Sequence, residues 1–403
     1  MRDTRPLACV MGDMDLLRPL GLARIPCVVV ARPGAAPRFS RFARAALPWV
    51  DTWEHADEQV DTLMRFASRQ SQPPVLFYQE DRDLLLVSRH RERLRSAFRF
   101  PIGDATVVED LVDKGRFQAL ARRLNLPVPV PVAQQLDLAR LPTAAEFDVP
   151  FPIVIKPLTR RTDRWAPLGG PGKAMLVESL EALQQLWPRV VTANVPVLAQ
   201  QLVPGPETHV ESYHVYVGEQ GEIVGEFTGR KIRTWPRQLG HSTALEITDS
   251  AEVTALGRAV MRRLELRGVA KLDFKRGADG RLYLLEINPR FTLWHHPAAL
   301  AGVNVPALVY GDLAGLPRPA ARRAHPGVRW CKIWQDAPAA RAAGVPLARW
   351  LPWALRCEAK SALSWDDPLP LLGAAAWAAG RRLAAWLRPL FLLARRPVKA
   401  RLP

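Results

Sequence analysis

Residues 268–290 (GVAKLDFKRGADGRLYLLEINPR) carry two carboxylates and an amide at spacings that suit a metal ion. Alternating polar and apolar segments flank the Asp-Gly pair at 279–280, and this pattern predicts a β-hairpin. Because side chains alternate along a strand, Asp273 occupies one face of the first strand, and Glu286 and Asn288 share one face of the second. If residues 279–280 alone form the loop, Asp273 lies opposite Glu286; a loop two residues longer or shorter makes them diagonal neighbours. Oxygen ligands without sulfur or imidazole favour Mg²⁺ or Mn²⁺.

The alternative for this hairpin is a solvated face that carries ordinary surface charges. The run Asn288-Pro289-Arg290 favours a site instead, because Pro ends a strand ladder and holds the preceding residue extended. Asn288 is therefore expected at a strand end. Arg290 follows at once, and it is the candidate for stabilising charge that develops during phosphoryl transfer.

The D-F pair at 273–274 and the L-L-E-I-N-P-R run at 284–290 resemble, in order and spacing, the magnesium-binding end of the ATP-grasp superfamily. The resemblance covers roughly residues 1–370 and is densest over 114–290. It implies ATP, Mg²⁺ and a carboxylate that is activated as an acyl phosphate. It also implies an α/β (α+β) fold, in which a small Rossmann-like domain precedes the ATP-grasp module, as in carboxylate–amine ligases of the D-aspartate ligase type.

The N-terminal domain is expected to span 1–108. An apolar strand at 6–11, a helical stretch and a second apolar strand at 25–30 predict a βαβ unit with a parallel sheet. The turn between them lacks the G-x-G-x-x-G pattern of dinucleotide-binding domains. The resemblance assigns 109–316 to the ATP-grasp module and leaves 317–403 as a C-terminal extension with a basic tail.

Glu80 and Asp81 follow a predicted strand at 74–78 and precede a predicted helix over 82–98. Carboxylates at a helix start favour a capping role. The alternative is a contact with substrate at the carboxyl edge of the sheet.

Two lysines lie where a phosphate contact is expected. Lys114 is in the first turn of a predicted helix, where the helix dipole disfavours a cation, so a functional role is indicated. Lys156 ends the apolar strand predicted over 152–157, where it points at an anion or extends into solvent. The resemblance implies that both lysines contact the nucleotide phosphates.

A long polar loop is expected at 159–168, and a Gly-rich turn follows it. The backbone N–H groups of Gly169, Gly170 and Gly172 could form an anion nest, with Lys173 beside it. The position of this turn matches the phosphate-covering loop of the superfamily. For Lys173, an ordinary charge at the edge of a loop is the alternative.

The resemblance also implies an adenine site on the strand predicted over 196–203. Gln200, Gln201 and Leu202 occupy the segment that binds the purine, although relatives usually carry Gln-Glu where this chain has two glutamines. A glutamine side-chain oxygen could still accept the hydrogen bond from the adenine amino group. Glu207 is at the position of the acid that contacts the ribose, and an ordinary turn charge is the alternative.

A basic cluster at 230–233 follows a predicted antiparallel pair of strands over 209–228. It is either a solvated edge or, as the resemblance implies, a contact with the γ-phosphate or the substrate carboxylate through Lys231 and Arg233. Further strands are predicted at 291–296 and 330–336. His295 and His296 lie in the first of these and should point apart, so they are expected to pack or line a substrate pocket rather than bind a metal.

The net charge of +17 indicates attraction to anions, but no aromatic–basic motif is evident, so no nucleic-acid partner is expected. Four scattered cysteines lack a C-x-x-C pair, and neither a signal peptide nor a run of ~18 apolar residues is found. We therefore expect a cytoplasmic protein, peripheral at the inner membrane face if its tail binds there.

Segment 371–403 has seven Lys or Arg and no acid, and it predicts a basic amphipathic helix. Packing on its own domain, or disorder, is the alternative. The basic side of the helix would comprise Arg381, Arg382, Arg388, Arg395 and Arg396.

Three functions compete. The first is an ATP- and Mg²⁺-dependent, ADP-forming ligase that joins a small carboxylate to an amine. The second is another ATP-grasp chemistry, such as carboxylation, although no biotin-carrier motif supports it. The third is a non-catalytic ATP-binding scaffold held at the membrane by the tail, and the complete set of expected metal ligands argues against it. Neither the substrates nor the oligomeric state follows from the sequence.

Overall fold

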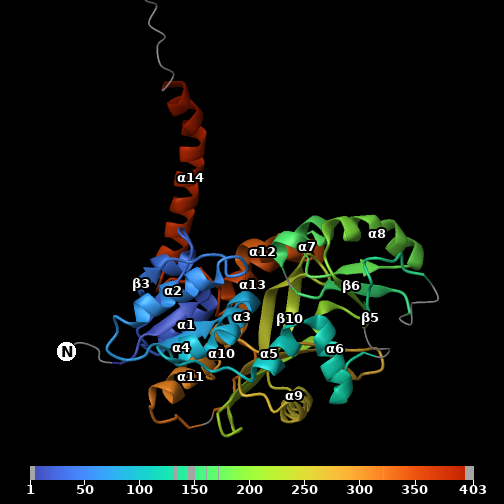
Figure 1. The fold of residues 1–403 in the computed structure, drawn as a ribbon, viewed down its shortest axis with the longest axis horizontal. Helices are drawn as coiled ribbons and strands as arrows, with labels where there is room; N and C mark the ends of the chain where they lie inside the picture. The colour runs from blue at the N-terminus through green and yellow to red at the C-terminus, as the bar shows by residue number, and fades with distance from the viewer. Residues whose placement is uncertain are drawn as a thin grey trace, which may run out of the picture.

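The computed structural model describes residues 5–129, 134–143, 150–159, 161–170, 172–320 and 322–394 (Figure 1). Three β-sheets organise the chain: a parallel N-terminal sheet, a small antiparallel sheet and a six-stranded antiparallel sheet. This arrangement confirms the predicted α/β (α+β) class.

The N-terminal sheet has the order β3-β2-β1-β4, and its strands run parallel as predicted. Alternate residues of β1 face two separate apolar clusters, because helices cover both faces of the sheet. The prediction of one helix over 82–98 was wrong in one respect, because the segment forms two helices that are separated at His90. The elements of this domain are β1 (Ala8–Met11), α1 (Met14–Leu22), β2 (Cys27–Val30), η1 (Ala36–Phe39), β3 (Ala43–Leu47), α2 (Ala56–Ala67), β4 (Val75–Tyr78), α3 (Asp81–Arg89) and α4 (Arg91–Arg95).

The small sheet has the order β5-β8-β6-β7 and carries α7 and α8 on one side (Figure 1). The long loop predicted at 159–168 was wrong, because much of it forms helix α7. Trp165 and Leu168 lie one turn apart on this helix, and both are buried in the core of the small sheet. The elements are β5 (Gln134–Gln135), β6 (Ile153–Pro157), α7 (Thr162–Gly169), β7 (Met175–Val177), α8 (Leu180–Ala193) and β8 (Val197–Gln201).

The six-stranded sheet has the order β13-β12-β9-β10-β11-β14 and has more strands than either of the other two described sheets. Helix α9 packs on β9 through its apolar residues. The elements are α5 (Ala105–Val112), α6 (Lys114–Arg123), η3 (Glu207–His209), β9 (Val210–Val217), β10 (Ile223–Trp235), β11 (His241–Thr248), α9 (Ala251–Leu264), β12 (Gly268–Arg276), β13 (Leu282–Asn288) and β14 (Arg329–Cys331).

Strands β12 and β13 form the predicted hairpin, but the reason for their register differs from the prediction. The loop between them spans 277–281 rather than 279–280 alone. That loop by itself would shift the pairing by one residue. A bulge corrects the shift, because Asp273 pairs with Glu286 while the next residue pairs with Leu284, which leaves Leu285 as the extra residue. The two carboxylates are therefore directly opposite each other.

Within the described residues, the C-terminal extension adds β14 to the large sheet, and three helices follow that strand. The strand predicted at 330–336 was wrong, because β14 ends at Cys331 and the chain continues as α12, which buries Asp336 and two alanines. The strand predicted at 291–296 was also wrong, since helix α10 begins at His295. The remaining elements are α10 (His295–Leu300), α11 (Val305–Ala314), α12 (Ile333–Ala342), α13 (Leu347–Arg356) and α14 (Leu369–Ala394).

Helix α14 leaves the first domain near η1 and projects away from the body of the molecule (Figure 1). The segment before it is anchored, because Asp367 accepts hydrogen bonds from Ser40 Oγ at 2.6 Å and from the Arg41 backbone N–H at 3.1 Å. Within the described ranges, no helix combines the length and apolarity that crossing a membrane requires. Arg395 and Arg396 of the predicted basic side lie outside the described residues.

Candidate active site

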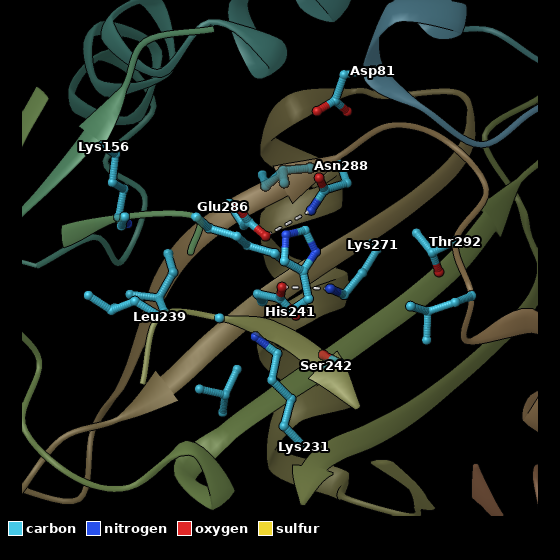
Figure 2. Close-up of a pocket in the computed structure, with 18 of the residues that line it drawn as sticks. Asp81, Lys156, Lys231, Leu239, His241, Ser242, Lys271, Glu286, Asn288 and Thr292 are labelled. Atoms are coloured by element: carbon cyan, nitrogen blue, oxygen red, sulfur yellow. Dashed lines mark hydrogen bonds and ion pairs between the residues drawn. The ribbon is translucent and has the colours of Figure 1, made fainter. Parts of the chain in front are cut away.

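A pocket of about 500 Å³ lies where the first domain, the small sheet and the large sheet meet. Figure 2 shows Glu286, Asn288 and Lys271 facing the same space from the β12–β13 hairpin, with Lys156 opposite them. The lining contains seven lysines and Arg290 against six acidic residues, so its balance of charge favours an anion. The lysines are Lys114, Lys156, Lys173, Lys231, Lys271, Lys275 and Lys332.

The three proposed metal ligands are brought together by the hairpin. Asp273 and Glu286 are cross-strand partners, and Asn288 Nδ2 donates to Glu286 Oε1 at 3.3 Å. Asp273 is almost fully buried and already holds two donors, the Lys271 ammonium at 2.6 Å and the Ser212 hydroxyl. Lys271 thus places a cation on Asp273 in the free site.

Glu286 is a buried carboxylate among cations. Burial alone would raise the pKa of Glu286, but the ammonium groups of Lys173, Lys271 and Lys231 hold it well below its ordinary value. The carboxylate is therefore ionised at neutral pH and remains a competent ligand for a divalent cation.

The proposed ligand set of two carboxylates and one amide oxygen fits Mg²⁺ or Mn²⁺ better than a softer metal. The Asn288 amide oxygen accepts from Arg290 Nη2, and His241 also lines the pocket. The described part of the chain has no cluster of three His, Cys, Asp or Glu side chains suited to a metal ion, since the third donor of the predicted set is the amide of Asn288. The surrounding lysines suit the phosphates that would bring the metal ion into the site.

Lys156 and Lys231 face the pocket from opposite sheets. The Lys156 ammonium donates to Gln200 Oε1 at 2.7 Å, and burial lowers the pKa of Lys156 to about 8. Burial would also lower the pKa of Lys231, but Asp273 and the nearby acids Glu207 and Glu286 raise it above its ordinary value. Lys231 is thus charged at neutral pH, whereas Lys156 loses its proton as the pH rises through about 8.

The adenine site is only partly assembled from the expected residues. Gln200 lines the pocket, but its side-chain oxygen, expected to accept from adenine, already accepts from Lys156. The Gln200 Nε2 group is buried and has no hydrogen-bond partner among the described residues, so it is available to a ligand. Gln201 and Leu202 do not line the pocket. Glu207 does, and it accepts a hydrogen bond from the Leu239 backbone N–H at 3.0 Å.

The Gly-rich turn is displaced from the pocket lining. Gly169 ends α7, Gly170 has a φ of +61° that favours glycine, and the carbonyl oxygen of Gly172 accepts from Trp165 Nε1 at 2.9 Å. Lys173, the next residue, does line the pocket. The structure therefore brings the lysine of this turn to the pocket and holds the three glycines behind it.

Arg233 is not brought to the pocket. Its guanidinium forms two hydrogen bonds to the fully buried carboxylate of Asp336, at 2.9 and 2.6 Å, and it stacks on Trp353. Asp336 also accepts from Thr243 Oγ1 and from Trp350 Nε1, each at 2.8 Å. The predicted substrate contact for Arg233 is thus replaced by a structural role, in which it fixes α12 and α13 to the large sheet.

Arg233→Met should lower the free energy of unfolding by about 3–5 kcal/mol, because it leaves Asp336 as a buried, uncompensated charge. Arg230→Met is the matched control, since Arg230 is on the same strand but pairs with Glu246 at the exposed surface, and its loss should cost less than about 1 kcal/mol. Urea unfolding of both variants tests this. Equal, small losses would mean that the buried pair does not anchor the extension.

Asp81 does not cap α3, which corrects the prediction for this residue pair. The Glu80 side chain at the N-cap makes no capping hydrogen bond, and Asp81 instead accepts from Arg290 Nε. Arg290 lines the pocket, as does Asp81. His295 and His296 are buried, and His296 Nδ1 lies 3.2 Å from Asp15 Oδ1, so their expected packing role is confirmed.

Several lining residues were given no role by sequence reasoning. The two-residue period of the strand predicts that Lys271 shares a face with Asp273, and the same period extends that face of β12 to Lys275. His241 follows the loop before β11 and faces the same space in Figure 2. Lys332 and Gln335 come from the C-terminal extension, and no local pattern placed them there.

Comparison with known proteins places this geometry in a family. Residues 222–334 match the family model described as ATP-grasp in the biosynthetic pathway with Ter operon. The D-aspartate ligase of Enterococcus faecium (strain Aus0004) is 23% identical over 263 residues, which cover 63% of this chain. The match spans 62% of the length of that relative.

Two solved structures share the fold. The L-amino acid ligase from Bacillus licheniformis superposes with a TM-score of 0.57 at 15% identity, covering 78% of this chain and 75% of that protein. The ADP complex of N5-carboxyaminoimidazole ribonucleotide synthetase gives a TM-score of 0.60 at 15% identity, covering 79% of both chains. These two matches show a shared fold. The family model and the distant ligase relative identify the chain as a member of the ATP-grasp superfamily and a distant homologue of D-aspartate ligase.

Proposed function

We propose that the protein is an ADP-forming ligase that activates a small carboxylate with MgATP and joins it to an amine. The observation that carries the proposal is the ionised Glu286 opposite Asp273 in a lysine-lined pocket. Such a site neutralises the charge of a transferring phosphoryl group, which is most of what phosphoryl transfer requires. The names of the relatives, D-aspartate ligase and L-amino acid ligase, support the same chemistry.

The proposed roles follow the geometry of the pocket. The metal ion would be held by Asp273, Glu286 and Asn288, and it would neutralise the β- and γ-phosphates when bound. Gln200 would meet the adenine through its unpartnered amide, and Glu207 would meet the ribose. The phosphates would be held by Lys114, Lys156 and Lys173.

The reaction has two steps. First, an oxygen of the substrate carboxylate attacks the γ-phosphorus, the bond to the β–γ bridging oxygen breaks, and ADP leaves. Arg290 and Lys231 stabilise the charge that develops on the transferred group. Second, the amine nitrogen attacks the acyl carbon, phosphate leaves, and the nitrogen loses a proton. Because an acyl phosphate hydrolyses in water, the pocket must exclude water between the steps.

ADP release from MgATP, measured against a matrix of amino acids and short peptides as acids and amines, tests the proposal. Hydroxylamine in place of the amine should trap the activated acid as a hydroxamate. We expect ADP only when an acid is present with an amine or hydroxylamine. Tight ATP binding without ADP across the matrix would favour a non-catalytic scaffold, and ADP release that requires bicarbonate would favour carboxylation.

We also propose that α14 rests on an anionic lipid surface. Leu369, Leu372 and Leu383 are each more than half exposed, and their spacings place them on one side of the helix. Arg381 and Arg382 are exposed as well, and segment 371–403 has seven Lys or Arg and no acid. An apolar stripe beside cations favours the headgroup region of an anionic bilayer.

The full-length protein should float with vesicles of phosphatidylcholine and phosphatidylglycerol, and added salt should weaken this binding. The double variant Leu372→Glu, Leu383→Glu should remain at the bottom of the gradient. Leu141→Glu is the matched control, because Leu141 is exposed to a similar extent but lies far from α14 in the sequence. Equal flotation with vesicles of phosphatidylcholine alone, or no loss in the double variant, would contradict the proposal.

A further inference from the structure

Arg290 directly follows the β12–β13 hairpin, yet two of the four hydrogen bonds that its guanidinium donates to described residues go to the first domain. Its Nη1 donates to the Gln79 carbonyl oxygen at 2.8 Å and to the Phe291 carbonyl oxygen at 3.3 Å. Its Nε donates to Asp81 Oδ1, and Nη2 donates to Asn288 Oδ1 at 3.3 Å. Only 13% of the Arg290 side chain and 22% of the Asp81 side chain are exposed, so solvent screens this pair only weakly.

These contacts leave one donor for a ligand. A guanidinium has five N–H groups in a rigid plane, and the four hydrogen bonds within the described residues use four of them. The remaining N–H is on Nη2, the nitrogen that also contacts the proposed metal ligand Asn288. The acceptors come from the end of β4, the start of α3 and the end of β13, so two domains together set the direction of that N–H.

Asp81 is the charged acceptor in this clamp, by which we mean the four hydrogen bonds that hold the Arg290 guanidinium. It lies in the first turn of α3, where the helix dipole favours a carboxylate. The other acceptors of Arg290 within the described residues are two backbone carbonyl oxygens and the Asn288 amide oxygen, which are neutral. Removal of the Asp81 charge therefore takes away the one ionic contact among these hydrogen bonds.

We propose that Asp81 is a positioning residue that aims Arg290 at the phosphoryl group in transit. The proposal rests on the ligase function, and it deepens that function by assigning to the first domain a part in catalysis. A guanidinium that is free to rotate would have to be ordered at the moment of reaction, whereas the clamped one is ordered beforehand.

Asp81→Asn keeps the shape of the side chain and removes its charge. We expect kcat to fall by about 10–100-fold, while KM for ATP changes by less than about threefold. Asp81→Glu restores the charge and should recover part of the loss. In an Arg290→Gln background, Asp81→Asn should have no further effect, because its role passes through Arg290.

Calorimetry gives a readout that does not depend on turnover. MgADP with aluminium fluoride mimics a phosphoryl group in transit, so the wild-type protein should bind MgADP more tightly when aluminium fluoride is added. Asp81→Asn and Arg290→Gln should both lose this gain, while their affinity for MgADP alone stays at the wild-type value. If no pair of acid and amine yields ADP, the ligase function is contradicted. The aluminium fluoride measurement still tests the role of Asp81 in that case, because it does not depend on turnover.

Asp83→Asn is the matched control. Asp83 is on the same helix, is buried, and bonds to Thr52 Oγ1 at 3.2 Å, but it does not line the pocket. Burial raises the pKa of Asp83 to about 7, so an amide replaces a carboxyl that is half protonated at neutral pH. We expect wild-type behaviour from it. The proposal would be overturned if Asp81→Asn kept the increase in MgADP affinity that aluminium fluoride gives. It would also be overturned if Asp81→Asn lowered both the affinity for MgADP alone and the melting temperature.

Discussion

Glu286→Gln should abolish Mg²⁺-dependent ADP release, lowering kcat by about 10²–10³-fold or more. The amide keeps the size of the carboxylate, so the pocket keeps its shape. What is lost is a negative charge that Lys173, Lys271 and Lys231 hold ionised against the effect of burial. Without that charge, the site repels a divalent cation more strongly than it attracts one.

Metal binding supplies a second measurement for this variant. Mn²⁺ titrations followed by electron paramagnetic resonance, in the presence of ADP, should show a large loss of affinity in Glu286→Gln. Glu211→Gln is the matched control, since Glu211 is on the same sheet but pairs with Arg276 away from the pocket lining. Turnover and Mn²⁺ affinity at wild-type levels in Glu286→Gln would show that the metal site lies elsewhere.

Lys156→Met should weaken MgATP binding by about 100-fold, because an ammonium on the phosphates is replaced by an apolar side chain of similar length. The geometry supports a direct role, since Lys156 ends β6 and faces the hairpin across the pocket. Lys360→Met is the control, because the Lys360 ammonium donates to the Cys357 carbonyl oxygen outside the pocket.

The pH dependence of binding identifies Lys156 more specifically. Burial lowers the pKa of Lys156 to about 8, so in the free protein its ammonium loses a proton as the pH rises through that value. A bound phosphate favours the protonated form, so binding takes up a proton, and MgATP affinity should fall above pH 8 by up to about tenfold per pH unit. Calorimetry in buffers of different ionisation enthalpy measures the uptake. An unchanged slope in Lys156→Met would assign the titration to another group.

Local sequence patterns predicted where several of the groups that line the pocket lie. The two-residue period of a strand placed Asp273, Glu286 and Asn288 on facing sides of a hairpin, and strand and helix ends located Lys156 and Lys114. These positions agree with the structure because each depends on neighbours in the chain, whose relative positions follow from the backbone geometry of one element. The predicted pairing of Asp273 with Glu286 is correct because two deviations cancel. The loop is longer than predicted, and the bulge at Leu285 restores the register.

Only the tertiary structure decided which charges meet. Arg233 lies near the end of β10 and Arg290 comes just after the end of β13, yet Arg233 pairs with Asp336, 103 residues away, while Arg290 reaches Asp81, 209 residues away. No periodicity in the sequence encodes such pairs, because they depend on how whole elements pack. The partner in turn sets the position of each arginine: a buried carboxylate outside the pocket holds Arg233 away from it, and an acid in the pocket lining keeps Arg290 there. The sequence by itself thus determined which groups could do the chemistry, and the packing of three sheets decided which of them were brought together to do it.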